Sequence, residues 1–542
     1  MRRYYNKERI CFNGLSVLLC FLLFLIISNR LFLAKTQPLN NNQNITWGPD
    51  FLISDEESDL AVTTKKGYAI QIDGDTVHVV WSSVLNQSNS EIYYRKSTDK
   101  GDSWSSSIRL TNADGSSMVP VLAYCQSNVY VVWKDNRDDT EAEIYFKSSS
   151  NYGADWGPDT RLTQTSDGSN APAIDVYKKN IYVVWEEKSD NPTTCKAYFR
   201  CSQDWGANWD NPVLISEDIP KQEDGAPSIT VGAGNIIHVV FGSDRNAGET
   251  AGYNWENYYT RSTDKGASWL APVRLTNDTT GDTRFPVVAT SGSKVHVAWW
   301  DDRVDNSYTH YGYPPAQPEE YKNYEIFYKR SLNNGLTWQE DFRLTHADRI
   351  SKSPSIIAQG DTVVVVWMDN RDNNYEIYLK YSIDGGTTWS EDIRATDDPY
   401  FSKSPSIAMD SLGTIYLLWS DNRTGKYEAY FKKSDSIITG FHKKHKENTN
   451  LTFSLKYNYP NPFNSVTTII YEVSSRAQVQ LVVFNLLGEE VARLINGESM
   501  PGTHEVQWDA KDLTGCDLPS GIYICKLTVG TTAQTRKLLL VR

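Results

Sequence analysis

Residues Ser97–Trp104 read STDKGDSW, and the recurrence of this pattern decides the fold. The pattern is Ser, any residue, Asp or Asn, any residue, Gly, any two residues, and Trp. A return about every 50 to 70 residues is typical of propellers and solenoids, in which each repeat is one supersecondary unit. There are six copies in all, the other five being SSNYGADW at Ser149–Trp156, SQDWGANW at Ser202–Trp209, STDKGASW at Ser262–Trp269, SLNNGLTW at Ser331–Trp338 and SIDGGTTW at Ser382–Trp389.

We call each copy a turn box, because its residue types suit a tight turn between strands. The Asp or Asn side chain caps the turn, and the Gly adopts a backbone conformation that other residues resist. The Trp is expected to pack between neighbouring sheets. The predicted structural residues are therefore Asp99, Asn151, Asp204, Asp264, Asn333 and Asp384, with Trp104, Trp156, Trp209, Trp269, Trp338 and Trp389.

Each turn box belongs to a larger unit with four predicted strands. A short strand containing Pro comes first, as in APAIDV, and a run such as VYVVW, ending at Trp133, follows. A third strand such as EIYFKSS precedes the turn box, and a fourth such as DTRLT comes after it. These β-branched and aromatic runs have strand length, and four strands per unit is the blade of a propeller.

The predicted second strands number seven, whereas the turn boxes number six. The seventh unit lacks its fourth strand, but Trp47–Ser54 (WGPDFLIS) nearly duplicates Trp156–Thr163 (WGPDTRLT). We therefore expect the N-terminal segment to supply the last strand of the last blade, which closes the ring and removes its open edges. The prediction is an all-β propeller over residues 45–440 with seven blades, six being the alternative.

The turn boxes resemble the Asp-box, or BNR repeat, of sialidase-like β-propellers. In that family, the resemblance implies, three Arg bind the substrate carboxylate, a Tyr activated by Glu is the nucleophile, and an Asp is the acid–base. The family's Arg-Ile-Pro motif has its nearest match in Arg284-Phe285-Pro286, on the fifth blade and with Phe in place of Ile. The candidates that this comparison yields for catalysis are Arg284, Arg303, and Tyr311 with Glu319 or Glu320.

The C-terminal region after the propeller has a different composition. A polar, basic segment is predicted to be a linker over residues 441–454. Residues 455–542 resemble the C-terminal sorting domain of type IX secretion substrates, on the motifs Tyr459–Asn464 (YPNPFN), Trp508-Asp509 and Pro519–Tyr523 (PSGIY). The resemblance implies a small immunoglobulin-like β-sandwich that addresses the protein to the secretion machinery. Its short strands with Gly and Pro turns agree with such a sandwich.

The N-terminus and the composition limit where the protein acts. Residues 1–34 combine a basic start with an apolar run, which predicts an export signal, with an uncleaved N-terminal anchor as the alternative. No other hydrophobic run follows, so we expect no integral membrane domain after the signal is removed. The net charge of −13 argues against nucleic acid as a partner. In an oxidising compartment Cys195 with Cys201, and Cys516 with Cys525, are near enough in sequence to form disulfides.

Charged residues follow the second strand of most blades. Four blades carry Asp-Asn-Arg or Asp-Asp-Arg there, a fifth carries Ser-Asp-Arg, and blades one and three depart from the pattern. Two interpretations remain open: a repeated ion-pair latch within the scaffold, or a ring of Arg that binds ligand carboxylates. The Arg residues concerned are Arg137, Arg245, Arg303, Arg371 and Arg423.

Two expanded loops break the symmetry of the repeat, Asn246–Asn257 on blade four and Val304–Lys322 on blade five. We expect them on the face opposite the turn boxes, where long loops on a rigid scaffold usually bind ligands. Aromatic platforms suit the apolar faces of sugars, whereas the plainer alternative is a solvated insertion. The candidate ligand-binding residues are Tyr253, Trp255, Tyr308 and Tyr313, with His310, Glu256 and Glu320 beside them.

The sequence thus predicts an exported or surface-attached propeller that binds an extracellular glycan or protein without a recognisable catalytic set. The alternative is an exo-sialidase-like glycoside hydrolase that acts on acidic sugars, and a purely structural surface component is a third reading. No metal site or cofactor is predicted. Asp-rich loops such as Asp73-Gly74-Asp75 leave only calcium open, although none of them matches a known calcium pattern.

Overall fold

The computed structural model describes residues 45–54, 60–62, 69–86, 89–138, 141–188, 194–217, 223–245, 255–277, 282–303, 323–347, 349–435, 438, 453–474, 476–485, 489–513, 515–529 and 532–542. The predicted signal, residues 1–34, lies outside these ranges. The chain divides into two compact units, residues 1–442 and 443–542. In the described ranges no helix has the length and apolarity needed to cross a membrane.

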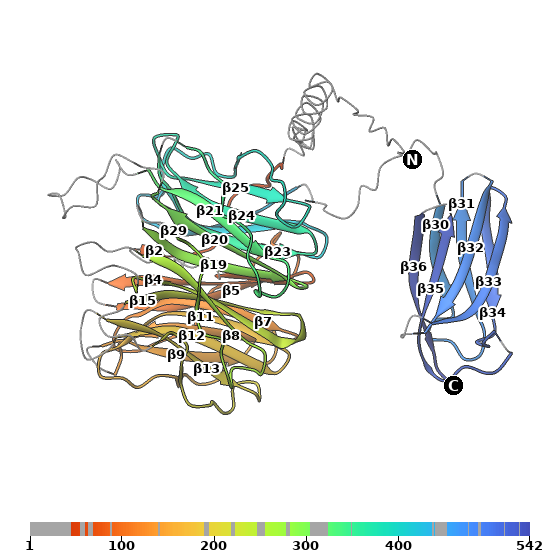
Figure 1. The fold of residues 1–542 in the computed structure, drawn as a ribbon, viewed down its shortest axis with the longest axis horizontal. Helices are drawn as coiled ribbons and strands as arrows, with labels where there is room; N and C mark the ends of the chain where they lie inside the picture. Colours follow the sequence, from red (N-terminus) through yellow and green to blue (C-terminus); the bar gives the residue numbers. More distant parts are fainter. Residues whose placement is uncertain are drawn as a thin grey trace, which may run out of the picture. The chain divides into compact units, whose positions relative to one another are not determined.

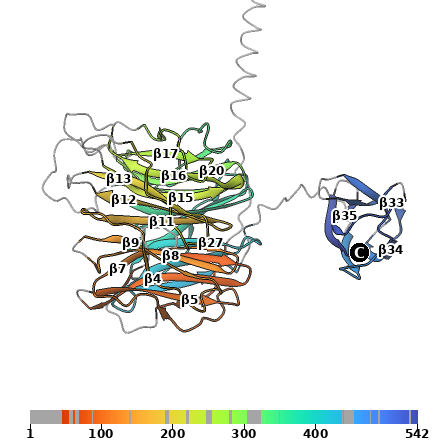
Figure 2. The same ribbon diagram turned by 90° about the horizontal axis from the view of Figure 1, so that it is seen from below.

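The first unit consists of seven antiparallel sheets, packed face to face as Figures 1 and 2 show. Blade 1 contains β2 (Leu60–Val62), β3 (Ile70–Asp73), β4 (Thr76–Asn86), β5 (Asn89–Ser97) and β6 (Ile108–Arg109). Blade 2 contains β7 (Ser117–Cys125), β8 (Asn128–Asp135), β9 (Glu143–Ser149) and β10 (Thr160–Arg161). Blade 3 contains β11 (Ser169–Tyr177), β12 (Asn180–Lys188), β13 (Cys195–Ser202) and β14 (Val213–Leu214).

The remaining blades follow in chain order. Blade 4 has β15 (Asp224–Gly232), β16 (Ile236–Ser243), β17 (Glu256–Ser262) and β18 (Val273–Arg274). Blade 5 has β19 (Thr283–Ser291), β20 (Lys294–Asp301), β21 (Glu325–Ser331) and β22 (Phe342–Arg343). Blade 6 has β23 (Ser351–Gln359), β24 (Thr362–Asp369), β25 (Glu376–Ser382) and β26 (Ile393–Arg394). Blade 7 has β27 (Ser402–Met409), β28 (Ile415–Asp421), β29 (Glu428–Lys433) and the distant β1 (Phe51–Leu52).

The first strands of the blades form the inside of a closed ring. Each of β3, β7, β11, β15, β19, β23 and β27 lies beside the first strand of the next blade, and β27 lies beside β3. The prediction of seven blades is therefore confirmed, and the alternative of six is wrong. The predicted closure is also confirmed, because β1 pairs with β29 through Phe51 opposite Phe431 and Leu52 opposite Tyr430.

The second strands are apolar on both faces because each blade lies between two others. On β8, Val131 and Trp133 face blade 1, whereas Tyr130 and Val132 face blade 3. This double burial explains why the sequence shows continuous Val-rich runs rather than an alternating pattern. The Trp that ends the run is fully buried in six blades: Trp81, Trp133, Trp185, Trp299, Trp367 and Trp419.

The turn boxes join the third and fourth strands and also join neighbouring blades. In the copy on blade 4, Gly266 N donates to Ser262 Oγ at 2.8 Å, and Ser268 N donates to Asp264 Oδ1 at 2.9 Å. Trp269 meets Phe199 of blade 3 edge-on, with ring centroids 4.9 Å apart. Gly266 has φ +92°, and a Cβ placed there would lie 2.1 Å from the Phe199 ring. Only glycine therefore fits between the two blades.

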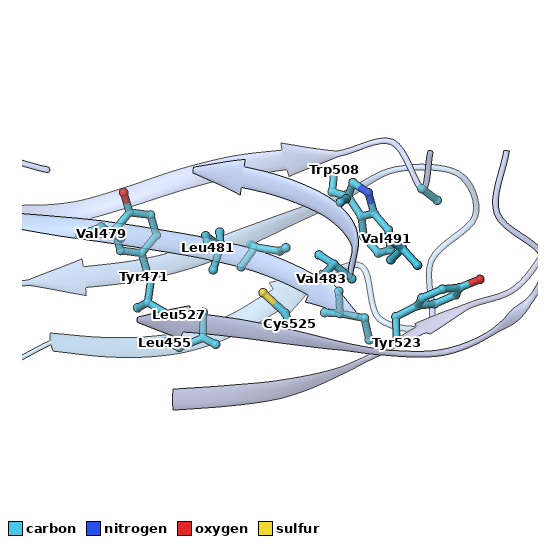
Figure 3. Packing of buried hydrophobic residues seen from close by; sticks show 14 of the residues in the cluster. Leu455, Tyr471, Val479, Leu481, Val483, Val491, Trp508, Tyr523, Cys525 and Leu527 are labelled. Carbon is cyan, nitrogen blue, oxygen red and sulfur yellow. The ribbon is translucent and has the colours of Figure 1, made fainter. Parts of the chain in front are cut away.

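The second unit is a sandwich of two antiparallel sheets. One contains β30 (Phe453–Tyr459), β31 (Thr467–Val473) and β34 (Gly502–Trp508). The other contains β33 (Glu490–Ser499), β32 (Ala477–Phe484), β35 (Gly521–Val529) and β36 (Thr532–Leu540). Residues from both sheets, among them Tyr471, Leu481 and Leu527, form its core (Figure 3). β30 begins inside the stretch predicted as linker.

The predicted disulfides are wrong, since all five cysteines in the described residues are free. Cys195 and Cys201 stand six residues apart on the single strand β13, so their Cα atoms are roughly 20 Å apart. A disulfide needs Cα atoms within about 7 Å. Cys525 is buried in the core of the sandwich, whereas Cys516 is exposed.

Candidate functional site

The two faces of the propeller differ in what they carry. Each turn box packs beside the hairpin between the first and second strands of its blade, as when Tyr152 N donates to Ser127 O at 2.7 Å. This end of the blades is the box face. The opposite end, which we call the loop face, carries the loops after the second strands and the beginnings of the first strands. In blade 2, for example, Ser117 at the start of β7 pairs with Asp135 at the end of β8. The loop face is where the candidate residues lie.

The Arg residues that follow the second strands are held in half-buried ion-pair clusters. On blade 6, Arg371 pairs with Asp369 at 2.6 Å and with Asp392 at 2.5 Å, while Lys380 reaches Asp392 at 2.6 Å. The guanidinium also lies 4.5 Å above the Tyr378 ring. The same arrangement recurs around Arg137, Arg303 and Arg423, which pair with Asp135 and Asp159, with Asp301 and Asp341, and with Asp421 and Asp50.

These clusters favour the latch interpretation of the Arg residues. Although burial opposes ionisation, the hydrogen bond to Asp369 raises the pKa of Arg371, so its charge is permanent. Each Arg holds two carboxylates. On blade 7, Lys432, which shares Asp50 with Arg423, also donates a hydrogen bond to Ala395 O of blade 6 at 2.8 Å. Arg245 is similarly engaged, with Asp224 at 3.2 Å and Glu217 at 3.1 Å. Their donors are committed to the scaffold, so we do not assign ligand binding to them.

Glu256 was expected on the exposed face and is instead fully buried. Its carboxylate accepts hydrogen bonds from Thr276 and Arg274 of its own blade. The same arrangement, a buried Glu that begins the third strand, recurs at Glu91, Glu143, Glu325 and Glu376. Repetition in five blades makes this Glu part of the scaffold rather than of a site.

Several of the predicted site residues lie outside the described residues. They are Tyr253, Tyr308, His310, Tyr311, Tyr313, Glu319 and Glu320. The pairing of Tyr311 with Glu319 or Glu320 therefore stays a prediction. Of the sequence candidates that are described, Arg284 and Trp255 are the two that the structure brings together on the loop face.

Near the loop-face end of the first strand, blades 5, 6 and 7 each have a backbone bulge in which the pairing with the second strand shifts. In blade 5 the pairing with β20 shifts between Arg284 and Val287, and Phe285 adopts φ +53° before Pro286. Blades 6 and 7 repeat the bulge at Ser353 and Ser404. The residue just before this strained position is a cation in all three blades, namely Arg284, Lys352 and Lys403.

Each of these three cations lies over an aromatic ring of the preceding blade. The Arg284 guanidinium is 5.0 Å from the Trp255 ring centroid, Lys352 Nζ is 4.3 Å from that of Tyr324, and Lys403 Nζ is 4.9 Å from that of Tyr375. The rings occupy one repeat position, directly before the third strand. We call these six residues the cation–aromatic array. It spans the neighbouring blades 4 to 7.

Further rings extend the cation–aromatic array. Phe285 stacks on Trp300 at 5.9 Å, and Lys403 also lies 4.9 Å from the Phe401 ring. Phe285 and Phe401 are both 39% exposed, which leaves these two rings accessible to a ligand. Trp255 packs on Gly225 and Gly242, and a Cβ at Gly242 would lie only 3.1 Å from the indole.

Carboxylates gather beside the cation–aromatic array, on blades 3 and 4. Glu186 Oε2 accepts a hydrogen bond from Ala226 N at 2.8 Å, and Asp244 Oδ1 accepts one from Glu223 N at 2.7 Å. Burial raises the pKa of Glu223, and the nearby charge of Asp244 raises it further, while Arg284 acts in the opposite direction. Burial likewise raises the pKa of Asp244. Within the part of the chain that the structure describes, no three His, Cys, Asp or Glu side chains are placed to hold a metal ion.

Sequence reasoning named Arg284 and Trp255 but missed most of the cation–aromatic array. A signal was present at one repeat position, which is aromatic in blades 4 to 7 (Trp255, Tyr324, Tyr375 and Tyr427) and not in blades 1 to 3 (Ser90, Ala142 and Cys195). Likewise Met118, Asn170 and Gly225 stand where blades 5 to 7 carry cations. Comparison of one repeat position across all blades would have revealed the change.

Comparison with known families agrees with both units of the fold. Residues 179–468 match the BNR repeat-like domain, and residues 458–541 match the secretion system C-terminal sorting domain. No curated protein matches the chain in sequence.

Solved structures resemble the propeller at low sequence identity. An ulvan lyase, described as a new family of polysaccharide lyase, is 11% identical with a TM-score of 0.52, over 71% of this chain and 95% of that one. The same lyase bound to a saccharide of glucuronic acid and sulfated rhamnose gives 0.51, with the same identity and coverage. A Hadza microbial sialidase is 15% identical with a TM-score of 0.41, over 66% of this chain and 73% of that one. At these identities the likeness concerns the fold alone.

Proposed function

Since the chain belongs to the BNR repeat-like domain family and ends in a secretion system sorting domain, we propose that it binds an extracellular carbohydrate at its cation–aromatic array. The sorting domain indicates secretion or attachment to the cell surface and implies contact with the secretion machinery. The observation that carries the proposal is the repeated cation–ring pair on three consecutive blade boundaries.

The chemistry of the cation–aromatic array suits sugars. Pyranose rings present apolar C–H faces that pack on aromatic rings, and their hydroxyls accept hydrogen bonds from charged donors. The exposed rings of Phe285 and Phe401 supply such faces. The array also breaks the symmetry of the repeat, as expected when one ligand touches several blades differently. Because its residues stand at strand ends, they are held in place before the ligand arrives.

The structural neighbours support a carbohydrate ligand without defining it. They are glycan-active enzymes, including the ulvan lyase bound to a saccharide of glucuronic acid and sulfated rhamnose.

A glycan array probed with the full chain, followed by titration calorimetry on the best glycan, tests the proposal. We expect Phe401→Ser and Tyr375→Ala to weaken binding about tenfold or more, because each removes a ring from the array. Tyr152→Asn is the matched control, since Tyr152 is 44% exposed on the box face. Equal loss in all three variants, or binding only to protein ligands, would refute the proposal.

The cluster of Glu223, Asp244 and Arg284 favours a second candidate, a glycoside hydrolase that acts on acidic sugars. A carboxyl group with a raised pKa beside a cation can donate a proton to a leaving group. In this case Glu223→Gln should abolish the release of reducing ends while saccharide binding persists. No release of product by the unchanged protein from any acidic glycan would remove the candidate.

A further inference from the structure

We propose that the ligand of the cation–aromatic array is a linear polyanion, a polysaccharide whose successive carboxylate or sulfate groups each meet one cation on blades 5, 6 and 7. This inference rests on the proposed function and narrows its ligand class. The three cations would be Arg284, Lys352 and Lys403.

The three cations stand on separate supports rather than around one point. Each is the second residue of the first strand of its own blade and lies over a ring of the blade before it. Packed sheets are of the order of 10 Å apart. A chain that passes along the three strand ends can therefore bring a new anionic group to each cation, whereas one small anion cannot reach all three.

Lys403 and Arg284 of the array differ from the latch residues in how their charge is balanced. Arg371 and the other latch residues are half-buried, and each holds two carboxylates. Lys403 instead lies within 5.5 Å of the centroids of three rings, those of Tyr375, Phe401 and Tyr427. A ring attracts a cation through its quadrupole and leaves the net positive charge in place for a ligand. Arg284 pairs with Asp282 at 3.1 Å, but its side chain is 35% exposed and the guanidinium has five donors.

The charge pattern on the loop face also sets the position of the chain. Blades 2 to 4 carry Met118, Asn170 and Gly225 at the cation position, and the carboxylates Glu186, Glu223 and Asp244 stand on blades 3 and 4. Like charges repel, so a polyanion is directed over blades 5 to 7 and away from blade 3. Because the whole chain carries −13 charges, such binding depends on this local patch and weakens as salt rises.

Calorimetry with the full chain tests the inference against four probes. Polygalacturonate carries carboxylates only, dextran sulfate carries sulfate esters only, dextran is neutral, and galacturonic acid is the single-charge monomer. We expect binding of at least one of the two polyanions that weakens with added NaCl, and far weaker binding of dextran and of the monomer. Which polyanion binds identifies the anionic group.

Variants then locate the charges. Lys352→Met and Lys403→Met place at these bulges the residue that blade 2 carries at Met118, so the fold should tolerate them. Each should weaken binding of the polyanion about tenfold or more and reduce its salt dependence. Lys403→Arg should retain binding. Lys178→Asn is the control, because Lys178 lies over the Tyr177 ring at 5.4 Å but on the box face.

The outcomes separate the inference from the proposed function. If dextran binds tightly and the Met variants do not change this binding, the inference that the ligand is a polyanion is wrong, whereas the proposal of carbohydrate binding stands. Monomer affinity equal to that of the polymer would overturn the multipoint contact. A folded chain that binds no carbohydrate on the glycan array would overturn both.

Discussion

At the scale of single residues, one side chain of the second strand and one of the third strand of the same blade vary together from blade to blade. Where the second strand carries His, the third strand carries Tyr, and the two are hydrogen-bonded, as in His296 Nδ1 to Tyr328 Oη at 2.6 Å. Where the second strand carries Tyr, the third strand carries Phe, and the rings are within stacking distance. The pairs are His78–Tyr94, His238–Tyr259 and His296–Tyr328 in one class, and Tyr130–Phe146, Tyr182–Phe199 and Tyr416–Phe431 in the other.

The His–Tyr pairs make the propeller sensitive to acid. Burial, together with the nearby charges of Arg330 and Lys294, lowers the pKa of His296 to about 3. In the unfolded chain the pKa is about 6.5, so the unfolded state binds more protons as the pH falls below that value. The free energy of unfolding that the neutral His296 contributes is thus fully present above pH 6.5 and is lost as the pH falls towards 3. At pH 5 the loss is about 2 kcal/mol for each such His.

Exchange of one pair for the other class should remove part of this sensitivity. In His296→Tyr/Tyr328→Phe, blade 5 acquires the pair that blades 2, 3 and 7 already hold, and the midpoint of urea unfolding should fall less between pH 7 and pH 5. Tyr328→Phe alone leaves the buried His296 Nδ1 without its partner and should cost about 1–3 kcal/mol at pH 7. An unaltered pH profile in the double variant would show that acid unfolding has another origin.

At the scale of the element, the turn box acts as a link between blades as well as a turn within one. Its Gly and Trp both contact the third-strand aromatic of the preceding blade, as Gly101 and Trp104 contact Phe431 across the point of closure. The link needs a backbone conformation with positive φ and also an absent side chain. These two requirements can be separated by experiment, because glycines such as Gly74 have a positive φ but have room for a side chain.

Gly266→Ala should destabilise the propeller more than Gly74→Ala does. Both glycines have positive φ, but a Cβ at Gly74 meets no atom within 4 Å, whereas a Cβ at Gly266 would collide with Phe199. Backbone strain alone costs about 1 kcal/mol, and overpacking adds about 1–3 kcal/mol. Urea unfolding of the two variants measures the difference. Equal costs would mean that blade 3 moves aside freely and that the contact is no link.

The cation–aromatic array shows where prediction from the sequence ended. The fold could be predicted, since turn boxes, Val-rich runs and the duplicated WGPD segment are local patterns that repeat. For the array, the sequence carries only a change of residue type at two repeat positions. The contact between a cation such as Lys352 and a ring of the blade before it, Tyr324, exists only once the sheets are packed. The same limit explains Glu256, whose partners Arg274 and Thr276 lie in the next strand, β18, and just after it.

At the scale of the whole molecule, the ring depends on a short segment from the distant end of the chain. Ile53 is fully buried, and its backbone N donates to Ala429 O of blade 7 at 2.8 Å. Its carbonyl oxygen accepts a hydrogen bond from Arg95 of blade 1 at 2.6 Å. Asp50 joins the latch of blade 7 through Arg423 and Lys432. One segment thus contacts both the first and the last blade, and we expect its loss to weaken the ring at this boundary.

Substitutions on the two faces of this segment should differ sharply. Ile53→Ala removes buried contacts between blades 7 and 1 and should cost about 2–5 kcal/mol, whereas Leu52→Ala, at a side chain 39% exposed, should cost little. Deletion of residues 45–54 should expose the edge of β29 in blade 7 to proteolysis. A synthetic peptide of those residues should restore part of the lost protection, because it can pair with β29 as β1 does. If the truncated chain melts at the same temperature as the full chain, the ring is held by the contacts between the other strands, and the N-terminal strand only covers an edge.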